Sequence, residues 1–268
     1  MEAALAGARS EDFELLASAV SSAGELALTY YGRTPHSQLK SDGTEVSEAD
    51  LAVDDLLKSA LLGARPGYGW LSEESSHDEG ARTSSLGWVV DPIDGTRAFL
   101  NGIPDWTVSV ALVDDKRPVL AVVFNPVKRE FFYAARGTGA FLNGEPLKLS
   151  PAHDIAGIKL AASEAMLERD IWQHPWPERQ KVWAKSIAYR LALTASGVFD
   201  ASIFNMSNDW DIAAAQLLVE EAGGLITSWR GKKLRYDGSI AKGEPMIAAG
   251  PALHAALLAR VQTALTRD

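Results

Sequence analysis

The segment Asp91-Pro92-Ile93-Asp94-Gly95-Thr96 places two carboxylates three positions apart, directly after a short apolar run. Pro92 fixes one backbone dihedral angle, and a strand that ends here would aim Asp91 out of its sheet. Gly95 allows a tight turn and the close approach of a ligand to the backbone. If a helix begins near Thr96, the free amides of its first turn form a seat for phosphate. The segment could therefore supply metal ligands, an anion-binding turn and a hydroxyl group.

A simpler interpretation stays open for this motif, because Asp, Pro and Gly are also the usual residues of a polar turn. One phosphatase class is excluded by the spacing. Haloacid-dehalogenase-type phosphatases carry D-x-D-G-T with a covalent aspartate nucleophile, whereas two residues separate Asp91 from Asp94 here. The chain has no cysteine, which excludes disulfides, thiolate catalysis and zinc–thiolate sites.

The bulk properties of the chain indicate a globular protein. Its 268 residues can bury a large core, and its fractions of hydrophobic and charged residues, 47% and 23%, are not those of a disordered chain. The net charge of −9 gives no support for binding a nucleic-acid polymer or an anionic membrane. It would also repel a phosphate unless bound divalent cations reversed the local charge. We find no signal peptide and no apolar run of about 20 residues, so we expect a cytoplasmic protein.

The elements that must position this motif can be read from residue periodicity. Apolar residues at spacings of three and four predict a helix over residues 11–31, and Ser47-Glu48-Ala49-Asp50 is a capping box that opens a second helix. Strands are expected in the first half at 87–90, 107–113, 119–124 and 130–134. Because short loops join these strands, the sheet that they form is expected to be antiparallel.

The second half of the chain alternates between strands and helices. Strands are expected at 158–163, 198–204 and 225–229, and helices at 186–195, 211–222 and 251–264. This layout predicts an α+β fold of two packed sheet-and-helix layers. We expect an N-terminal α+β lobe over 1–150 and a C-terminal α/β lobe over 151–268 that closes the site. Since no Gly/Ser-rich linker separates them, the lobes should form one continuous unit.

Four blocks of the sequence, taken together, resemble the inositol monophosphatase superfamily of magnesium-dependent, lithium-sensitive phosphatases. They occur in the family's order over residues 40 to 224: Lys40 with Glu45 to Asp54; Leu71 to Ser75; Val90 to Thr96; and Trp210-Asp211 with Ala213, Ala214 and Glu221 to Gly224. The resemblance implies a layered α-β-α-β-α sandwich, a homodimer and a small phosphorylated metabolite as substrate. It also implies two or three Mg²⁺ ions per site, with Mn²⁺ as a substitute and Li⁺ and Ca²⁺ as inhibitors.

The resemblance also implies a role for individual residues. Glu73, Asp91 and the Ile93 carbonyl would bind one Mg²⁺, and Asp91, Asp94 and Asp211 would bind a second. The backbone amides of Gly95 and Thr96 would hold the phosphate. Asp50, Thr96 and Glu73 would act on the attacking water, while Ser72 replaces a glycine that relatives commonly have. All the proposed side-chain ligands are carboxylates, which suits a cation that prefers hard oxygen ligands.

Each of these residues has a structural explanation when it is taken alone. Asp211 could simply cap a helix, Asp50 could serve only the capping box, Glu73 could lie in a solvated loop, and Lys40 could be a surface lysine. Independent explanations of this kind do not account for four blocks in register. A non-catalytic, metal-binding or regulatory relative is a further alternative, although the complete ligand set argues against it.

The substrate is less well defined by the sequence than the reaction. Inositol-selective relatives usually place acidic or histidine residues just before the Trp-Asp pair, where this chain has residues 204–209, Phe-Asn-Met-Ser-Asn-Asp. Arg97 and Arg190 could bind a second phosphate, or could be surface or dimer contacts. With Lys40 and Asn205 as further substrate contacts, we expect a 3′(2′),5′-bisphosphate nucleotidase acting on 3′-phosphoadenosine 5′-phosphate. Inositol-1-phosphate phosphatase is the first alternative and histidinol-phosphatase the second.

The eight tryptophans raise one further possibility, a structural protein that forms oligomers. Trp172, Trp176 and Trp183 cluster beside His174-Pro175, and aromatic residues are enriched at interfaces. This segment is therefore the candidate contact of a homodimer, with ordinary core packing as the alternative.

Overall fold

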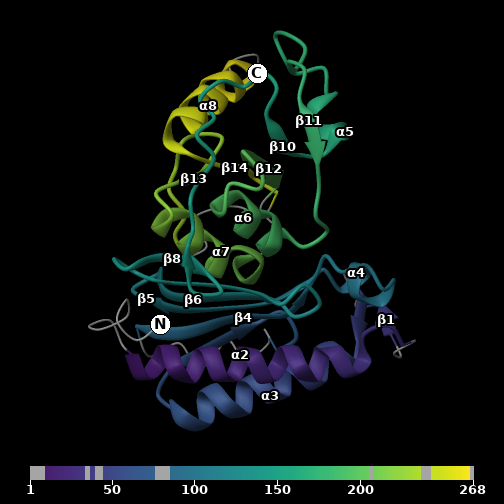
Figure 1. Cartoon of the computed structure of the whole chain (residues 1–268), viewed down its shortest axis with the longest axis vertical. Helices are drawn as coiled ribbons and strands as arrows, with labels where there is room; N and C mark the ends of the chain where they lie inside the picture. The colour runs from purple at the N-terminus through teal and green to yellow at the C-terminus, as the bar shows by residue number, and fades with distance from the viewer. Residues whose placement is uncertain are drawn as a thin grey trace.

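The computed structural model describes residues 10–33, 37–39, 45–75, 85–205, 208–236 and 243–265. Its elements stack in five layers, so the predicted α-β-α-β-α sandwich is confirmed (Figure 1). Helices α2 and α3 lie at the base, followed by a seven-stranded sheet, helices α6 and α7, a five-stranded sheet, and finally helices α5 and α8.

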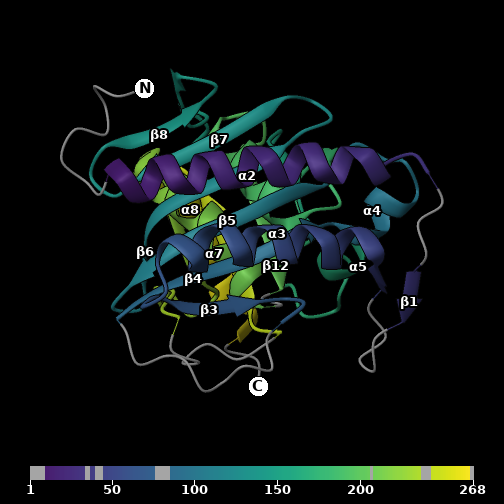
Figure 2. The same ribbon diagram turned by 90° about the horizontal axis from the view of Figure 1, so that it is seen from below.

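The basal layer consists of α2 (Ser10–Tyr30) and α3 (Glu48–Ala64), which lie side by side across the sheet (Figure 2). The apolar face predicted for residues 11–31 is the face that α2 buries, with Phe13, Leu16 and Val20 almost inaccessible to solvent. The hairpin β1 (Ser37–Leu39) and β2 (Glu45–Ser47) leads directly into α3. The capping box at Ser47 therefore fixes where α3 begins.

The seven-stranded sheet is antiparallel from β4 to β9, as expected, and β3 is added in parallel beside β4. The connection over residues 73–85 that separates β3 from β4 is long enough for a parallel crossover. In spatial order the strands are β3 (Gly69–Ser72), β4 (Leu86–Asp94), β5 (Thr107–Asp114), β6 (Arg117–Asn125), β7 (Glu130–Ala135), β8 (Gly139–Leu142) and β9 (Glu145–Pro146). The pairing of β4 with β5 shifts register between Asp91 and Asp94.

The middle layer, α6 (Ile187–Ala195) and α7 (Asp209–Glu221), is covered by sheets on both sides. Nearly all of α7 is therefore buried, and its run Ala213 to Ala215 lets the backbone pack closely. The core around α7 draws residues from both halves of the chain. The division into lobes at residue 150 stays a prediction.

The upper layers belong to the second half of the chain. The five-stranded sheet is mixed, and outer helices α5 (Glu164–Leu167) and α8 (Pro251–Leu265) cover its far face. In spatial order its strands are β11 (Gln180–Val182), β10 (Lys159–Ala161), β12 (Ala201–Asn205), β14 (Pro245–Ala249) and β13 (Leu225–Ser228). Of the tryptophans proposed as a dimer contact, Trp172 and Trp176 pack against the hydrophobic core between the five-stranded sheet and its outer helices. The ring centres of Trp172 and Trp229 are 5.3 Å apart.

The sequence predicted most of these elements but not all of them. The five long helices begin and end close to the expected residues, whereas the strands β1, β2, β3, β9, β11 and β14 and the short helix α5 were not expected. These strands have two to five residues, too few for a periodicity to be recognised. Lys40, expected as a substrate contact, lies outside the described residues. No described helix is long and apolar enough to cross a bilayer.

The end of α6 generates a stability prediction. Gly197 has a φ of +73°, and a Cβ atom placed there would lie 2.7 Å from the Lys148 carbonyl oxygen and 3.0 Å from the Ser150 amide nitrogen. Gly197→Ala should therefore lower the free energy of unfolding by about 3 kcal/mol, combining left-handed strain with a backbone clash. Gly157→Ala is the matched control, because Gly157 has a φ of +75° with open space around it. It should cost about 1 kcal/mol. Equal losses in urea unfolding would contradict the packing argument.

Candidate active site

Three buried aspartates meet where β4 faces the start of α7. Carboxylate oxygens of Asp91, Asp94 and Asp211 lie within 4.8 Å of one another. Burial, reinforced by repulsion from neighbouring carboxylates, raises the pKa of Asp91 well above its usual range. Burial also raises the pKa of Asp94 to about 6 and that of Asp211 to about 8. The protein therefore holds three carboxylates close together, and their ionisation is unfavourable in the absence of a cation.

The donor set of this cluster fits a hard divalent cation. Its members are all carboxylates, the type of ligand that Mg²⁺ prefers. In addition, Asp91 Oδ1 is fully buried and has no hydrogen-bond donor among the described residues. A buried acceptor without a donor is costly, and a bound cation would satisfy it.

The local sequence explains how β4 delivers two ligands. The register shift falls at Pro92-Ile93, where Pro92 has no N–H to give to the ladder. Gly95 follows with a φ of +98° and begins the short helix α4 (Thr96–Leu100). A Cβ atom on Gly95 would lie 3.1 Å from the Asp105 carbonyl oxygen, so both its conformation and its surroundings require glycine. The turn proposed from the D-x-x-D-G-T motif is therefore present.

Asp94 is held by the beginning of α6, which lies far away in the sequence. Ser186 Oγ donates to Asp94 Oδ2 at 2.5 Å, and the amide of Ala188 donates to the same oxygen at 2.6 Å. The amide of Ile187 donates to Oδ1 at 3.3 Å. Ser186 is also the N-cap of α6, since its Oγ accepts from the Tyr189 amide at 2.8 Å. The sequence did not indicate this role, although a serine at the first position of the helix predicted over residues 186–195 was a usable signal for a cap.

Asp50 caps helix α3 and also lies beside Thr96 at the site. Its Oδ2 accepts from the Ser47 amide at 2.8 Å, and the Asp50 amide donates to Ser47 Oγ at 3.4 Å, which together form the capping box. Ser47 Oγ also donates to Asp50 Oδ2 at 2.5 Å. Its Oδ1 lies 3.2 Å from Thr96 Oγ1, which in turn lies 3.2 Å from the Ile93 carbonyl oxygen. Burial raises the pKa of Asp50 to about 6. Asp211 likewise belongs to a capping box, with Asn208 at the start of α7.

Glu73 follows β3 and lines the same cavity, outside the cluster of three aspartates. Asp54 on α3 holds the segment that carries it. Asp54 Oδ1 accepts from Ser72 Oγ at 2.5 Å, and Oδ2 accepts from Ser75 Oγ at 3.0 Å. The sequence analysis gave Asp54 no role. Its position one helical turn after Asp50 could have indicated that both face the site.

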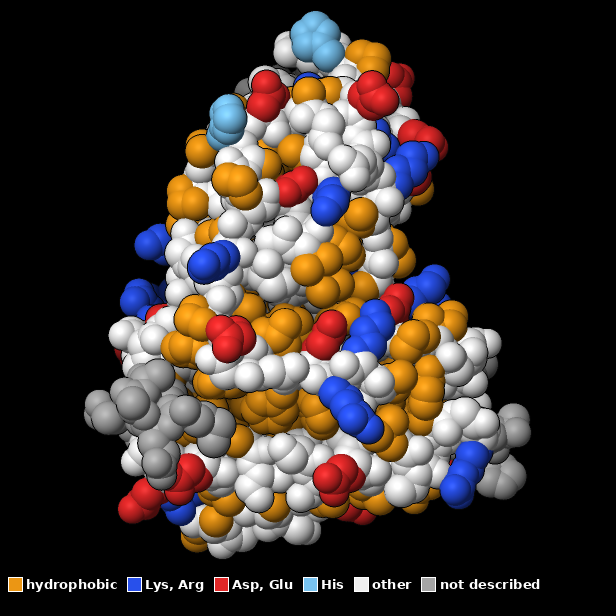
Figure 3. Space-filling model, in the orientation of Figure 1, with side chains coloured by type: hydrophobic (Ala, Val, Ile, Leu, Met, Phe, Trp, Pro, Cys, Tyr) orange, Lys and Arg blue, Asp and Glu red, His pale blue; other side chains and the backbone are white. Residues whose placement is uncertain are grey.

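The three aspartates of the cluster line a cavity of about 630 Å³ together with Glu73 and the Gly95-Thr96 turn. Its lining also includes the basic residues Arg97, Lys185 and Arg190. Arg97 lies at its edge, 72% exposed, with Nε 3.6 Å from Glu45 Oε2. Arg190 is buried in its wall. Asn205 ends β12, is exposed, and is not among the described lining residues. On the face seen in Figure 3 the outline narrows above the seven-stranded sheet, and Lys and Arg side chains lie on the side that carries α4.

Comparison with known proteins extends these observations to the whole chain. Residues 9–266 match the model of the inositol monophosphatase family. An inositol-1-monophosphatase of Mesorhizobium japonicum is 34% identical over 251 residues, covering 90% of this chain and 94% of the relative. A 3′(2′),5′-bisphosphate nucleotidase of Aggregatibacter actinomycetemcomitans is 32% identical over 233 residues, covering 80% and 83%.

The fold agrees with solved structures as well. The structure of an IMPase from Thermotoga maritima superposes with a TM-score of 0.81 at 25% identity, covering 95% of this chain and 98% of that one. A match over nearly the full length, together with the buried aspartate cluster, accounts for all four sequence blocks. This chain therefore belongs to the inositol monophosphatase family and is a metal-dependent phosphomonoesterase.

Proposed function

We propose that this enzyme releases phosphate from the monoester of a small polyol, of the inositol 1-phosphate type, with Mg²⁺ as its cofactor. The observation that carries the proposal is the buried cluster of Asp91, Asp94 and Asp211 on the wall of a cavity, next to the Gly95-Thr96 turn. The similarity to an inositol-1-monophosphatase over nine-tenths of the chain supports the choice of substrate.

The carboxylates would form two cation sites. Asp91, Asp94 and Asp211 would bind one ion, and Glu73 with Asp91 and the Ile93 carbonyl would bind a second. When bound, such cations lower the pKa of water and stabilise charge on phosphate and leaving-group oxygens. Ser186 Oγ and the first amides of α6 donate hydrogen bonds to Asp94 and fix the orientation of its carboxylate. This ligand therefore does not rotate when the neighbouring carboxylates gain or lose a proton.

Thr96 and Asp50 form the route for a proton. A water molecule hydrogen-bonded to Thr96 Oγ1 would be in contact, through that hydroxyl, with Asp50 Oδ1. Because the pKa of Asp50 is about 6, its carboxylate is mostly ionised at pH 7 and can accept the proton. The amides of Gly95 and Thr96 would bind the phosphate oxygens at the glycine turn.

A bisphosphate nucleotide, the substrate expected first, has less support than inositol phosphate. Arg97, one of the two arginines on which that expectation rests, lies 3.6 Å from Glu45 Oε2, while Arg190 and Lys185 line the cavity as further cations. A related nucleotidase matches a smaller part of the chain than the inositol-1-monophosphatase does. The homodimer and the cytoplasmic location remain predictions.

A substrate panel tests this proposal. Phosphate release with Mg²⁺ should give a kcat/KM for inositol 1-phosphate at least about tenfold above that for 3′-phosphoadenosine 5′-phosphate or histidinol phosphate, because the similarity to an inositol-1-monophosphatase covers more of the chain than the similarity to a nucleotidase. EDTA should abolish release, Mg²⁺ should restore it, and excess Ca²⁺ should inhibit because it favours looser coordination. A tenfold preference for the nucleotide would overturn the choice of substrate.

Asp91→Asn tests the metal cluster with two readouts. Turnover with Mg²⁺ should fall more than about a hundredfold, because the variant loses a ligand that both ions would share. The metal-free variant should melt at a higher temperature than the metal-free wild type, because one buried charge is gone. Mg²⁺ should raise the Tm of the wild type and leave that of the variant unchanged. Glu74→Gln is the control and should behave as wild type; a Mg²⁺-stabilised, active Asp91→Asn enzyme would refute the assignment.

Asp54→Ala tests whether this residue positions Glu73. Loss of its bonds to Ser72 and Ser75 should raise the Mg²⁺ concentration for half-maximal activity about 10- to 100-fold, as expected for a residue that orients a ligand. Asp55→Ala removes the adjacent exposed carboxylate and should change neither this concentration nor Tm. A drop in Tm for Asp54→Ala without a change in Mg²⁺ dependence would mean that Asp54 is purely structural.

A further inference from the structure

A tyrosine near the beginning of α6 is tied to the hairpin formed by β6 and β7. Tyr189 Oη donates to Glu130 Oε2 at 2.6 Å, and Glu130 is the first residue of β7. Burial raises the pKa of Tyr189 further above its usual range, so the phenol stays protonated and acts as the donor. The buried ring of Tyr189 also packs edge-on against Phe132 of β7. The side chain of Tyr189 is therefore held at both its ring and its hydroxyl group.

The turn that joins β6 to β7 also holds the segment that joins α4 to β5. Lys128, in this turn, has its Nζ 4.8 Å from the centre of the Tyr189 ring and donates from Nζ to Asp105 Oδ1 at 3.0 Å. The buried Asn125 precedes the turn, and its Nδ2 donates to the Pro104 carbonyl oxygen at 2.9 Å. Asp105 and Tyr189 are therefore both held by side chains of the β6–β7 hairpin.

These two held residues meet at Ser186, the residue that donates to Asp94. The Ser186 amide donates to the Asp105 carbonyl oxygen at 3.2 Å, and Ser186 Oγ accepts from the Tyr189 amide at 2.8 Å. Displacement of either Asp105 or Tyr189 would therefore move the hydroxyl group and the two amides that hold the Asp94 carboxylate.

The side chains of this network lie outside the cavity itself. None of Glu130, Lys128, Tyr189 and Asp105 is among the described residues that line it. Any effect of these residues on the reaction must therefore pass through the groups that they hold. Mg²⁺ requires nearly ideal octahedral geometry, so a small rotation of one carboxylate ligand weakens its binding.

We propose that Glu130 and Lys128 are positioning residues for Asp94, acting through the beginning of α6 and the segment that joins α4 to β5. The inference rests on the role proposed above for Asp94 as a metal ligand and is independent of the choice of substrate. Removing a group that orients a ligand directly changes metal affinity about 10- to 100-fold, so we expect about 3- to 10-fold for groups one step further away.

Tyr189→Phe removes the hydroxyl group without changing any charge. It should raise the Kd for Mg²⁺, measured by titration calorimetry, about 3- to 10-fold. Tyr68→Phe is the matched control, because Tyr68 Oη donates to Asp12 Oδ2 at 2.9 Å and Tyr68 does not line the cavity. Both variants lose one bond from a phenol to a carboxylate, so both should lower Tm, and only Tyr189→Phe should change the Kd.

Glu130→Ala should raise the Kd for Mg²⁺ as much as Tyr189→Phe does. Glu130→Gln should recover most of the affinity, because its amide oxygen still accepts a hydrogen bond from the phenol. Both substitutions remove the same negative charge, so the difference between them measures the hydrogen bond alone.

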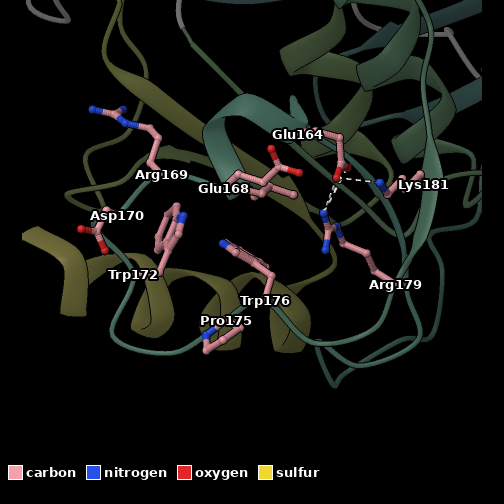
Figure 4. A pocket seen from close by; sticks show the side chains of 10 residues that line it. Glu164, Glu168, Arg169, Asp170, Trp172, Pro175, Trp176, Arg179 and Lys181 are labelled. Atoms are coloured by element: carbon pink, nitrogen blue, oxygen red, sulfur yellow. Dashed lines mark hydrogen bonds and ion pairs between the residues drawn. The ribbon is translucent and has the colours of Figure 1, made fainter.

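Lys128→Met removes the ion pair with Asp105. Loss of a positive charge would by itself favour Mg²⁺ binding, so a Kd raised about 3- to 10-fold would reflect lost positioning. Lys181→Met is the matched control. Lys181 Nζ pairs with Glu164 Oε2 at 2.8 Å beside a second cavity of about 520 Å³, between α5 and the segment that leads into β11 (Figure 4). That variant should keep the Kd within about twofold of wild type, because the solvent screens a distant exposed charge.

The outcomes separate this inference from the proposed function. Wild-type protein that binds Mg²⁺, together with variants of Tyr189, Glu130 and Lys128 that lose Tm but keep the wild-type Kd, would show that the hairpin is purely structural and overturn the inference alone. Equal losses of affinity in the two control variants would also overturn it. Wild-type protein that binds no Mg²⁺ would overturn the metal assignment and this inference with it. If Glu130→Ala does not fold, as judged by its Tm, Tyr189→Phe and Lys128→Met decide between the same alternatives.

Discussion

Repulsion among buried carboxylates is the constraint around which this fold is arranged. Two ionised oxygens separated by 4.8 Å repel each other by roughly 3 kcal/mol at an effective dielectric constant of about 20. The protein offsets this repulsion with groups aimed at the cluster: Ser186 and two amides at Asp94, a cap amide at Asp211, and the guanidinium of Arg190 nearby. Among the described residues, none donates a hydrogen bond to Asp91 Oδ1, so the uncompensated charge lies at an oxygen that a cation would bind.

Two of the side chains proposed to act in the reaction also cap helices. Asp50 uses one carboxylate oxygen to begin α3 and presents the other to Thr96, and Asp211 belongs to the capping box of α7. The structural explanation of these residues is therefore correct, and their functional roles stay predictions that the capping geometry does not exclude. Each of these carboxylates lies in the first turn of a helix, and a helical turn fixes a side chain more firmly than a loop would.

Patterns within short segments predicted the long helices, most strands and the turn at Asp91 to Thr96, whereas the five-layer sandwich and the place of Asp211 in the cluster were implied by the resemblance to the family. Helix α2 follows from the spacing of Phe13, Leu16 and Val20, and the glycine turn follows from the motif at Asp91. Ser186 and Asp54 act on residues that lie far away in the chain, so no local pattern marks their role. The partners of Arg97 and Arg190 could not be predicted for the same reason: one pairs with Glu45 and the other stacks on Trp183, and only packing decides which cation remains available.

The start of α6 contributes to the site in two ways that differ in how they respond to mutation. Ile187 and Ala188 hold Asp94 through backbone amides, which any residue except proline supplies. The side chains of Ile187 and Arg190 instead face the cavity. Substitutions of these two side chains would therefore change the wall of the cavity while leaving in place the amides that hold Asp94.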